Sequence, residues 1–427
     1  MNLSTSLRAM PFVIKSSALA CALCCASLAS AQSSVTLYGL ADVGITSVSG
    51  LKAGTVTQLS SGIMEGSRWG LKGTEDMGGG YKAIFTLEAR VELDTGSSSN
   101  RPISWPQLSD RFSQASLMGL PATLQPAVSG IDAALANEFG VNVGASGNRV
   151  FDRQAFVGLI TPFGAVLGGR QYTPAFETNA IYDIMGTQSG LSAGQIVAFP
   201  AVLEIRTSNA LAYRFAKDGI SGSLMYALGE VAGDSSKGRL LGFNVNYKTD
   251  SFSVGAAHNA KKNELGQDSL TTTVLGASMN IGSGTASAMA IKITDDNPAG
   301  LSIIAPMLTP QIGAGAAGLV QSAFLTAFKQ DGTLLHVGYR HITGPHTISV
   351  AYTTYNDNRP ADADVSSYGV AYTYALSKRT DLNAVVVRYD NKNLAQVAPG
   401  GNGYIGGVTS SAATDSTGLA LGVRHRF

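Results

Sequence analysis

The side chains that could carry out catalysis or bind a metal are few in this chain, and they are scattered. None of its five histidines has the spacing that would place it on one face with two further metal ligands. His336 and His341, for example, are expected on opposite faces of one strand. The pattern also gives no serine or carboxylate set held beside a histidine. We therefore expect no metal, no cofactor and no enzymatic activity.

Three further motifs have simple explanations. Asp295-Asp296-Asn297 and Asp357-Asn358 could bind calcium weakly, but acids solvated in loops are the simpler interpretation. Gly78-Gly79-Gly80 lacks the lysine and the helix of a phosphate-binding loop and suits a tight turn instead. All three cysteines lie before residue 26. The rest of the chain therefore offers no thiol for a disulfide, a redox centre or a metal site.

The N-terminus resembles an export signal. Arg8 and Lys15 precede an apolar run over residues 16–28, and Ala29-Ser30-Ala31 fits a cleavage site. We predict a signal peptide at residues 1–31 and a mature chain at 32–427. The apolar run is too short to span a membrane, so a retained anchor is a weaker alternative, as is lipoprotein cleavage before Cys21. Export and the lack of cysteine in the mature chain both indicate the cell envelope.

The composition narrows the class of protein. The chain carries 30 basic and 29 acidic residues, so it lacks the basic excess of a nucleic-acid-binding protein. Charged residues make up only 14%, which is low for a soluble domain. Yet the mature chain has no apolar stretch of the ~20 residues that a membrane helix needs. A secreted all-β protein and an outer-membrane barrel remain.

The last strand alternates between apolar and charged positions. Leu419, Leu421 and Val423 share one face with Phe427, whereas Arg424 and its polar neighbours lie on the other. A barrel strand that faces lipid outside and water inside needs this pattern. The same alternation returns about every 10–12 residues, and tyrosines and phenylalanines near the strand ends suit aromatic girdles at two membrane interfaces.

Short turns and longer loops alternate between the strands, which is typical of outer-membrane barrels. Sixteen strands leave an aqueous channel inside a barrel, and their even number places both termini at the periplasmic side. The fold class that we predict is therefore all-β, a transmembrane 16-stranded antiparallel β-barrel that passes solute. Its strands are expected at 34–47, 67–74, 80–94, 150–160, 165–172, 206–216, 221–229, 239–249, 252–262, 271–281, 285–295, 333–343, 347–356, 366–376, 382–390 and 417–427.

Several motifs, in order along the mature chain, resemble those of one family. They are Ser34-Val35-Thr36-Leu37-Tyr38-Gly39, Ser67-Arg68-Trp69-Gly70-Leu71-Lys72-Gly73-Thr74-Glu75-Asp76, Arg153-Gln154-Ala155-Phe156-Val157-Gly158-Leu159, Gly169-Arg170-Gln171 and Gly422-Val423-Arg424-His425-Arg426-Phe427. The chain is similar to the general diffusion porins of Gram-negative outer membranes, in particular their beta-proteobacterial branch. Each motif is weak alone, and the ordered set is fairly specific.

The resemblance implies a homotrimer of barrels whose third external loop, here residues 172–205, narrows the lumen. It implies an acidic loop, with Glu177, Asp183 and Glu204, that faces a basic wall. By motif position the wall residues are Arg68, Arg153 and Arg206, and further candidates are Arg170, Arg90 and Lys72. Opposed charges across a narrow wet gap would orient polar solutes and bias ion passage. A solvated arginine without a role in the constriction is the alternative for each basic residue, and the sequence does not give the direction of the loop acids.

Two stretches depart from the family pattern. Residues 95–149 form an unusually long connection, and residues 297–332 form a second one that is apolar, in which 313–328 could be a helix. Each could pack on its own barrel rim or reach a neighbouring subunit, as the second loop does in family members; the rim is the favoured interpretation for the later stretch, and neither is favoured for the earlier one.

These features predict a passive, water-filled channel for small hydrophilic solutes and ions across the outer membrane. Its partners would be two further copies of the chain, outer-membrane lipid and lipopolysaccharide, with Phe427 as the assembly signal and no nucleic acid. A substrate-specific channel or a surface adhesin-like barrel is the alternative. Few aromatic residues are expected on the lumen side, which counts against a sugar-specific channel.

Overall fold

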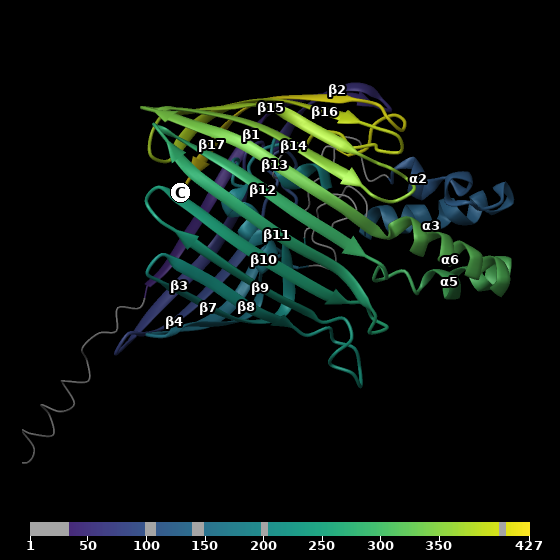
Figure 1. Ribbon diagram of the computed structural model, residues 1–427, viewed down its shortest axis with the longest axis horizontal. Coiled ribbons are helices and arrows are strands. Elements are labelled where there is room, and N and C mark those ends of the chain that lie inside the picture. The colour runs from purple at the N-terminus through teal and green to yellow at the C-terminus, as the bar shows by residue number, and fades with distance from the viewer. Residues whose placement is uncertain (1–33, 99–107, 139–148, 198–203, 401–406) are drawn as a thin grey trace, which may run out of the picture.

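The computed structural model describes residues 34–98, 108–138, 149–197, 204–400 and 407–427. The predicted signal peptide, residues 1–31, lies outside these ranges. The described chain is mostly β-strand, with a group of helices beyond one end of the sheet (Figure 1). None of the described helices is both long enough and apolar enough to cross a membrane.

Seventeen strand segments form one antiparallel sheet. They are β1 Ser34–Leu51, β2 Gly54–Ser61, β3 Arg68–Gly78, β4 Tyr81–Arg90, β5 Gln154–Thr161, β6 Gly164–Tyr172, β7 Arg206–Lys217, β8 Ile220–Ala227, β9 Leu240–Lys248, β10 Phe252–Lys262, β11 Asp268–Ile281, β12 Gly284–Asp295, β13 Gln330–Thr343, β14 His346–Asp357, β15 Val365–Ala375, β16 Thr380–Asn391 and β17 Ser416–Arg426.

The sheet closes on itself because β1 pairs with β17, from Leu40 opposite Arg426 to Val48 opposite Gly418. The segments β2 and β3 both pair with β1, so they are two halves of one barrel strand. The seventeen segments therefore make a closed barrel of sixteen strands, which confirms the predicted fold class. A closed barrel satisfies every strand edge, which is what a sheet in lipid requires.

The second barrel strand differs from its prediction. Only 67–74 was expected as strand, but the structure adds β2 before it and inserts residues 62–67 between the two halves. Alternation could not reveal this break, because β2 is largely polar on both faces and the inserted residues leave the sheet. We call residues 62–67 the inward segment, because Ile63 and Met64 are buried against the loop inside the barrel.

The outer face of the barrel is apolar and exposed, as the alternation predicts. Leu421 is 65% exposed and Val157 is 63% exposed, in a structure without lipid. Many of the exposed aromatic residues lie near the strand ends beside the short turns, where a girdle at the lipid–water interface is expected. They include Phe163, Tyr213, Phe215, Tyr247, Phe252 and Phe427.

Short turns join the strands at the end that holds the C-terminus (Figure 1). In the turn between β7 and β8, Asp218 and Gly219 have φ of 52° and 81°, the left-handed conformation of a tight hairpin. The terminal Phe427 pairs with Gly39 through hydrogen bonds of 3.0 and 3.1 Å, and so extends the seam between the first and last strands. Its role as an assembly signal stays a prediction.

The two long insertions fold into helices at the opposite end. The helices and helical turns outside the barrel are α2 Asp110–Ser113, η1 Ala115–Met118, η2 Ala122–Leu124, α3 Gln125–Glu138, α5 Ile304–Ile312 and α6 Ala314–Phe328. Helix α6 confirms the helix predicted at 313–328. Apolar side chains of both insertions form one core, with Phe112, Val128, Leu308 and Phe324 among its buried members. We call these packed helices the helical cap.

Candidate pore constriction

The connection between β6 and β7 is described at residues 173–197 and 204–205; it enters the barrel there, and we call it L3. It begins with helix α4, Pro174–Tyr182, whose first turn is stabilised by a hydrogen bond from the Phe176 N–H to the Thr173 hydroxyl. Helix α4 packs along the inner face of β8 to β12. A Cβ atom on Gly276 of β11 would lie 2.2 Å from Cγ of Tyr182. Glycine at this position therefore lets the helix approach the wall.

Beyond α4, L3 crosses to the other side of the lumen. The Ile184 N–H donates to Nε2 of His336 on β13 at 3.1 Å, and farther along the Tyr389 hydroxyl on β16 donates to the Gly190 carbonyl at 2.7 Å. The Ser189 N–H donates to the Met64 carbonyl of the inward segment at 3.0 Å. L3 is therefore held to the wall from β8 round to β16.

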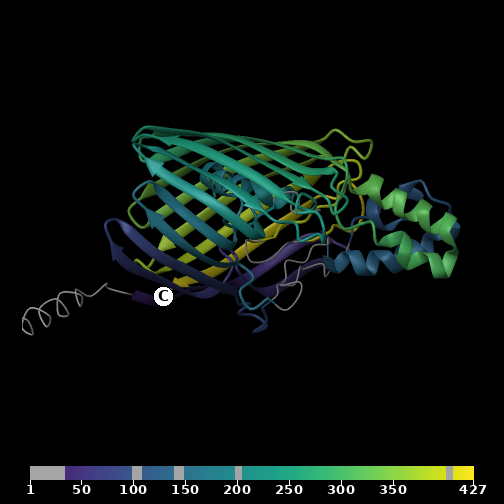
Figure 2. The same ribbon diagram turned by 90° about the horizontal axis from the view of Figure 1, so that it is seen from below.

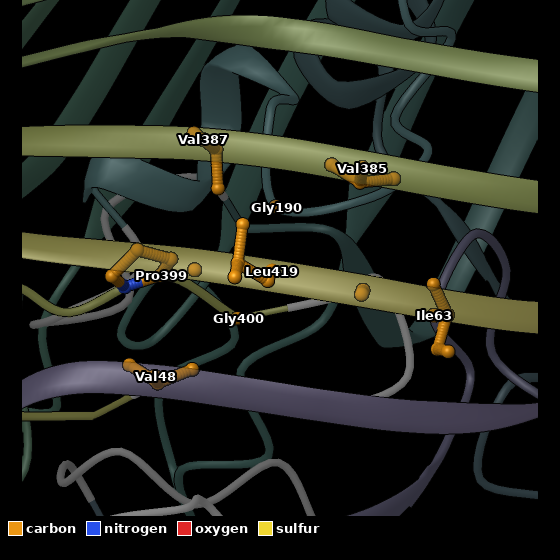
Figure 3. A pocket seen from close by; sticks show the side chains of 10 residues that line it. Val48, Ile63, Gly190, Val385, Val387, Pro399, Gly400 and Leu419 are labelled. Atoms are coloured by element: carbon orange, nitrogen blue, oxygen red, sulfur yellow. The ribbon is translucent and has the colours of Figure 1, made fainter. Parts of the chain in front are cut away.

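Apolar contacts fix the far end of L3. Leu191, Ile196 and Val197 are buried in a core shared with inward-facing residues of β14 to β16. A crevice of about 10 Å³ remains where Gly190 meets the wall, lined among others by Val48, Ile63, Val385 and Val387 (Figure 3). This volume is about the least that can hold one water molecule, so the crevice is a packing gap rather than a solute site.

The inward segment is held by one buried carboxylate. Asp42 on β1 accepts hydrogen bonds from the backbone N–H groups of Ile63, Met64 and Glu65 at 2.8–3.1 Å. This places the Glu65 carboxylate in the lumen, where it lies 2.5 Å from Arg68. Glu65 also accepts hydrogen bonds from Arg424 and Arg426 of β17, at 2.8 and 2.9 Å. The side-chain amide of Gln188 in L3 donates to Glu65 at 3.2 Å. Asp381 of β16 forms ion pairs with the same two arginines of β17.

The three arginines predicted for the basic wall lie together. Glu88 on β4 accepts from Nε of Arg153 at 2.7 Å and lies 3.8 Å from Arg68. The Tyr172 hydroxyl accepts from Arg153 at 3.3 Å and from Arg206 at 3.1 Å. Among the described residues, no carboxylate lies within ion-pair distance of Arg206. The register between β6 and β7 shifts near Arg206, at a bulge where Asn209 has φ of 57°, so the strict alternation used to place Arg206 does not extend across it.

The remaining basic candidates have different surroundings. Arg90 lies opposite Arg68 in the sheet and is 3.1 Å from Glu92 and 3.6 Å from Asp152. We call Arg68, Arg90, Arg153 and Arg206 the arginine cluster.

Arg170 and Lys72 are separate from that cluster. Arg170 donates to the Asp152 carbonyl at 2.6 Å and to the Ser208 hydroxyl at 3.1 Å, so it braces the wall. Lys72 lies over the Tyr38 ring, 5.1 Å from its centroid, and is exposed to the lumen nearer the short turns.

The three acidic candidates of L3 lie apart from one another. Glu177 in α4 pairs with Arg214 of β7 at 2.5 Å. Glu204 forms an ion pair with Lys261 of β10. Asp183 is buried, and its carboxylate accepts from the N–H groups of Met185 and Thr187 and from the Ser192 hydroxyl at 2.7–3.0 Å. Asp183 therefore shapes the bend of L3 from within.

Sequence reasoning missed the acids that contact the arginines. Glu88 lies two residues before Arg90 on β4 and therefore on the same face of the strand, so its lumen position could have been predicted from strand parity. Arg424 and Arg426 were placed on the polar face of the last strand but were not assigned to the pore. Glu65 carried no signal, because it lies in a segment outside any regular strand. Among the described residues, no group of three or more histidine, cysteine, aspartate or glutamate side chains is arranged to hold a metal ion.

The geometry leaves charge concentrated on one wall of the lumen. L3 lies along the inner wall from β8 to β16, and the arginine cluster lies on β3, β4 and β7 and before β5, on the part of the wall that L3 does not cover. Guanidinium groups and carboxylates that face a gap of this kind create a field across it.

Comparisons with known proteins agree with this architecture. A family model described as Gram-negative porin matches residues 16–394. Outer membrane porin protein 32 of Delftia acidovorans is 26% identical over 97% of this chain and 100% of its own length. An outer membrane porin protein of Bordetella pertussis is 24% identical over 94% of this chain and 96% of its own length. The solved structure of an anion-selective porin from Comamonas acidovorans has 23% identity and a TM-score of 0.65, and covers 93% of this chain and 100% of that one.

The family match spans well over half of the chain, and the closed sixteen-stranded barrel agrees with it. The chain therefore belongs to the Gram-negative porin family, whose barrels form passive channels in the outer membrane.

Proposed function

We propose that this porin is a water-filled diffusion channel for small hydrophilic solutes and ions, whose narrowest part lies between L3 and the arginine cluster. The observation that carries this proposal is the joining of Arg68, Arg153 and Arg206 through Glu88 and Tyr172, on the part of the wall that L3 leaves uncovered. Such preorganised charges act on a solute without first having to be rearranged.

The balance of charge supports a modest preference for anions. Glu65, Glu88, Glu92, Asp152 and Asp381 each pair with arginines of the cluster or of β17. Arg206 is left without a carboxylate among the described residues, so it supplies the excess positive charge. The Comamonas acidovorans relative, which is described as anion-selective, points the same way.

The loop acids have separate parts in this proposal. Glu177 and Glu204 line the two ends of the passage, where they offset the charge of Arg214 and Lys261. Asp183 keeps the bend of L3 in place. The negative charge of the narrowest part is then supplied by Glu65 and Glu88, which lie beside the arginines on the wall and do not belong to the loop.

The homotrimer is part of the same proposal. The exposed large side chains on the outer face of β1 and β5 are aliphatic, whereas the exposed aromatics of β7, β9 and β10 suit a lipid interface. We place the subunit contacts on the aliphatic face, and lipid with lipopolysaccharide around the rest. The aliphatic residues are Val35, Leu37, Ile45, Val157 and Leu159.

Planar-bilayer recording tests the channel. The purified protein should give ohmic conductance in steps of three. Replacement of Arg68, Arg153 and Arg206 with glutamine should move the reversal potential toward cations in a salt gradient. Arg388→Gln is the matched control, because Arg388 lies at the outer end of β16, is 43% exposed and pairs with Asp390 and Asp415. An unchanged reversal potential in the triple variant would show that these arginines do not set the selectivity, and a protein without conductance would exclude a channel.

A further inference from the structure

The helical cap is built from two loops that leave the barrel at opposite sides. The first loop leaves β4 at Arg90 and returns to β5 at Gln154. The second loop leaves β12 at Asp295 and returns to β13 at Gln330. Following the pairing order round the barrel, β4 and β12 are eight barrel strands apart, which is half of the circumference. The helices of these two loops start from opposite sides of the barrel. They can share one core only if the loops reach across the mouth of the barrel.

The shared core shows that the two loops do meet. The rings of Phe112 in α2 and Phe328 in α6 have centroids 4.7 Å apart, and Phe324 lies 6.3 Å from Phe328. Phe112, Val128 and Phe324 are fully buried. The span is therefore a packed body with its own interior, and burial of aromatic and aliphatic side chains stabilises it.

Polar contacts fasten this body to the rim. Asp357, at the end of β14, binds Arg111 of α2 at 3.3 Å and Arg359 at 2.6 Å, and its side chain is fully buried. Arg359 also donates to the Ala327 carbonyl at 3.3 Å and to that of Lys329, at the C-terminal end of α6. The Asp110 N–H donates to the Gln396 side chain, in the loop after β16, at 2.6 Å. Four loops are thus tied together over the mouth.

Both views place the helices beyond the barrel end opposite the C-terminus, within the outline of the barrel continued along its long direction (Figures 1 and 2). The cap carries little charge: its helices hold only Asp110, Arg111, Asp132 and Glu138, and residues 112–131 and 297–328 contain no Asp, Glu, Lys or Arg. A domain with so little charge affects a passing solute by steric exclusion rather than by its electric field.

We propose that the helical cap is a size filter over the outer mouth of the channel, one that hinders large hydrophilic molecules before they reach the constriction. The inference rests on the proposed channel function. Small solutes enter beside the cap and are selected at the arginine cluster, so that size and charge are discriminated at two different depths. The solute class that the cap excludes is a neutral, flexible polymer too wide for the openings at the rim.

The test uses polyethylene glycols of increasing mass, added to one side of a planar bilayer at a time. A polymer that enters the channel mouth lowers the conductance, so each side yields its own size cut-off. For the wild-type trimer we expect a smaller cut-off from the outer side than from the inner side. Equal cut-offs from the two sides would overturn the filter. A wild-type protein with no conductance would overturn the channel function, and the filter with it.

Two variants open the cap. Phe112→Asp places a charge in the core of the cap. Replacement of residues 108–138 with a short glycine-serine linker removes the first of the two loops that form the cap. The second variant keeps the test valid if the point variant misfolds. In both, the cut-off from the outer side should rise to that from the inner side, whereas the inner cut-off stays unchanged. Leu319→Asp is the matched control, because Leu319 is 57% exposed on α6 and outside the core. An outer cut-off that survives the removal of residues 108–138 would contradict the proposal.

Discussion

The carboxylate of Glu88 accepts a hydrogen bond from Nε of Arg153 at 2.7 Å, and its other oxygen accepts one from the Tyr38 hydroxyl at 3.1 Å. Glu88 also lies 3.8 Å from Arg68, so one acid from the wall holds two members of the arginine cluster. Clustered guanidinium groups repel one another, and a shared carboxylate lowers that cost. The position of the arginines and the charge of the constriction therefore depend on the same residue.

Glu88→Gln should strengthen the preference for anions, because it removes a negative charge and keeps every positive charge of the arginine cluster. The reversal potential in a salt gradient should move toward anions, opposite to the arginine variants. Because the Glu88 and Arg153 side chains are only 6% and 7% exposed, loss of the pair should also destabilise the barrel, by up to about 3–5 kcal/mol in denaturant titrations. Glu75→Gln, on an exposed part of β3, is the control. A shift toward cations would contradict the assignment.

Gly276→Ala should displace L3. The added methyl carbon would lie 2.2 Å from Tyr182, so either α4 moves away from the wall or β11 is distorted, at a cost of about 1–3 kcal/mol. We expect a lower thermal midpoint together with a changed single-channel conductance. In Gly168→Ala the new atom meets nothing within 4 Å, which makes it the matched control. Equal behaviour of the two variants would mean that the contact between Tyr182 and β11 does not position the loop.

Asp42→Ala should release the inward segment. Its carboxylate binds three backbone N–H groups, and a single hydrogen bond to a charged group contributes about 1.5–3 kcal/mol. The barrel should lose at least that much stability, and the conductance should change because Glu65 is no longer held beside Arg68. Asp250→Ala, in an exposed turn, is the control. A variant with unaltered conductance would show that the inward segment does not line the pore.

The barrel could be predicted from the sequence because its determinants are local. Alternation places Leu421 outside and Arg424 inside, and turn residues such as Asp218-Gly219 mark the short connections. The site was predicted only in part, because its remaining contacts join residues that are distant in the sequence. Glu65 meets Arg424 only after the barrel closes, and nothing in the sequence near Phe112 indicates that it packs against Phe328. The first interaction depends on how the barrel closes, and the second on two loops from opposite sides of the barrel that meet in space; alternation encodes neither.

The helical cap should loosen as the pH rises. Burial in α3 raises the pKa of Asp132 to about 6, only partly offset by Lys52, and one of its carboxylate oxygens is buried without a hydrogen-bond partner among the described residues. Since the pKa of an unfolded aspartate is about 3.9, the folded cap favours the neutral acid. Its contribution to stability is fully present below about pH 4 and is lost as the pH rises through about 6.

Hydrogen exchange of the α3 amides, corrected for the intrinsic effect of pH, measures this loss. Between pH 4 and pH 8 the protection should fall in the wild type, and Asp132→Asn should remove most of that dependence, because its side chain stays neutral throughout. Asp250→Asn, in an exposed turn far from the cap, should follow the wild type. If Asp132→Asn lost protection over the same pH range, another group would have to control the cap. If the filter is correct as well, the cut-off for polymers added from outside should rise with pH in the wild type and stay constant in Asp132→Asn, which ties the stability of the cap to what the channel admits.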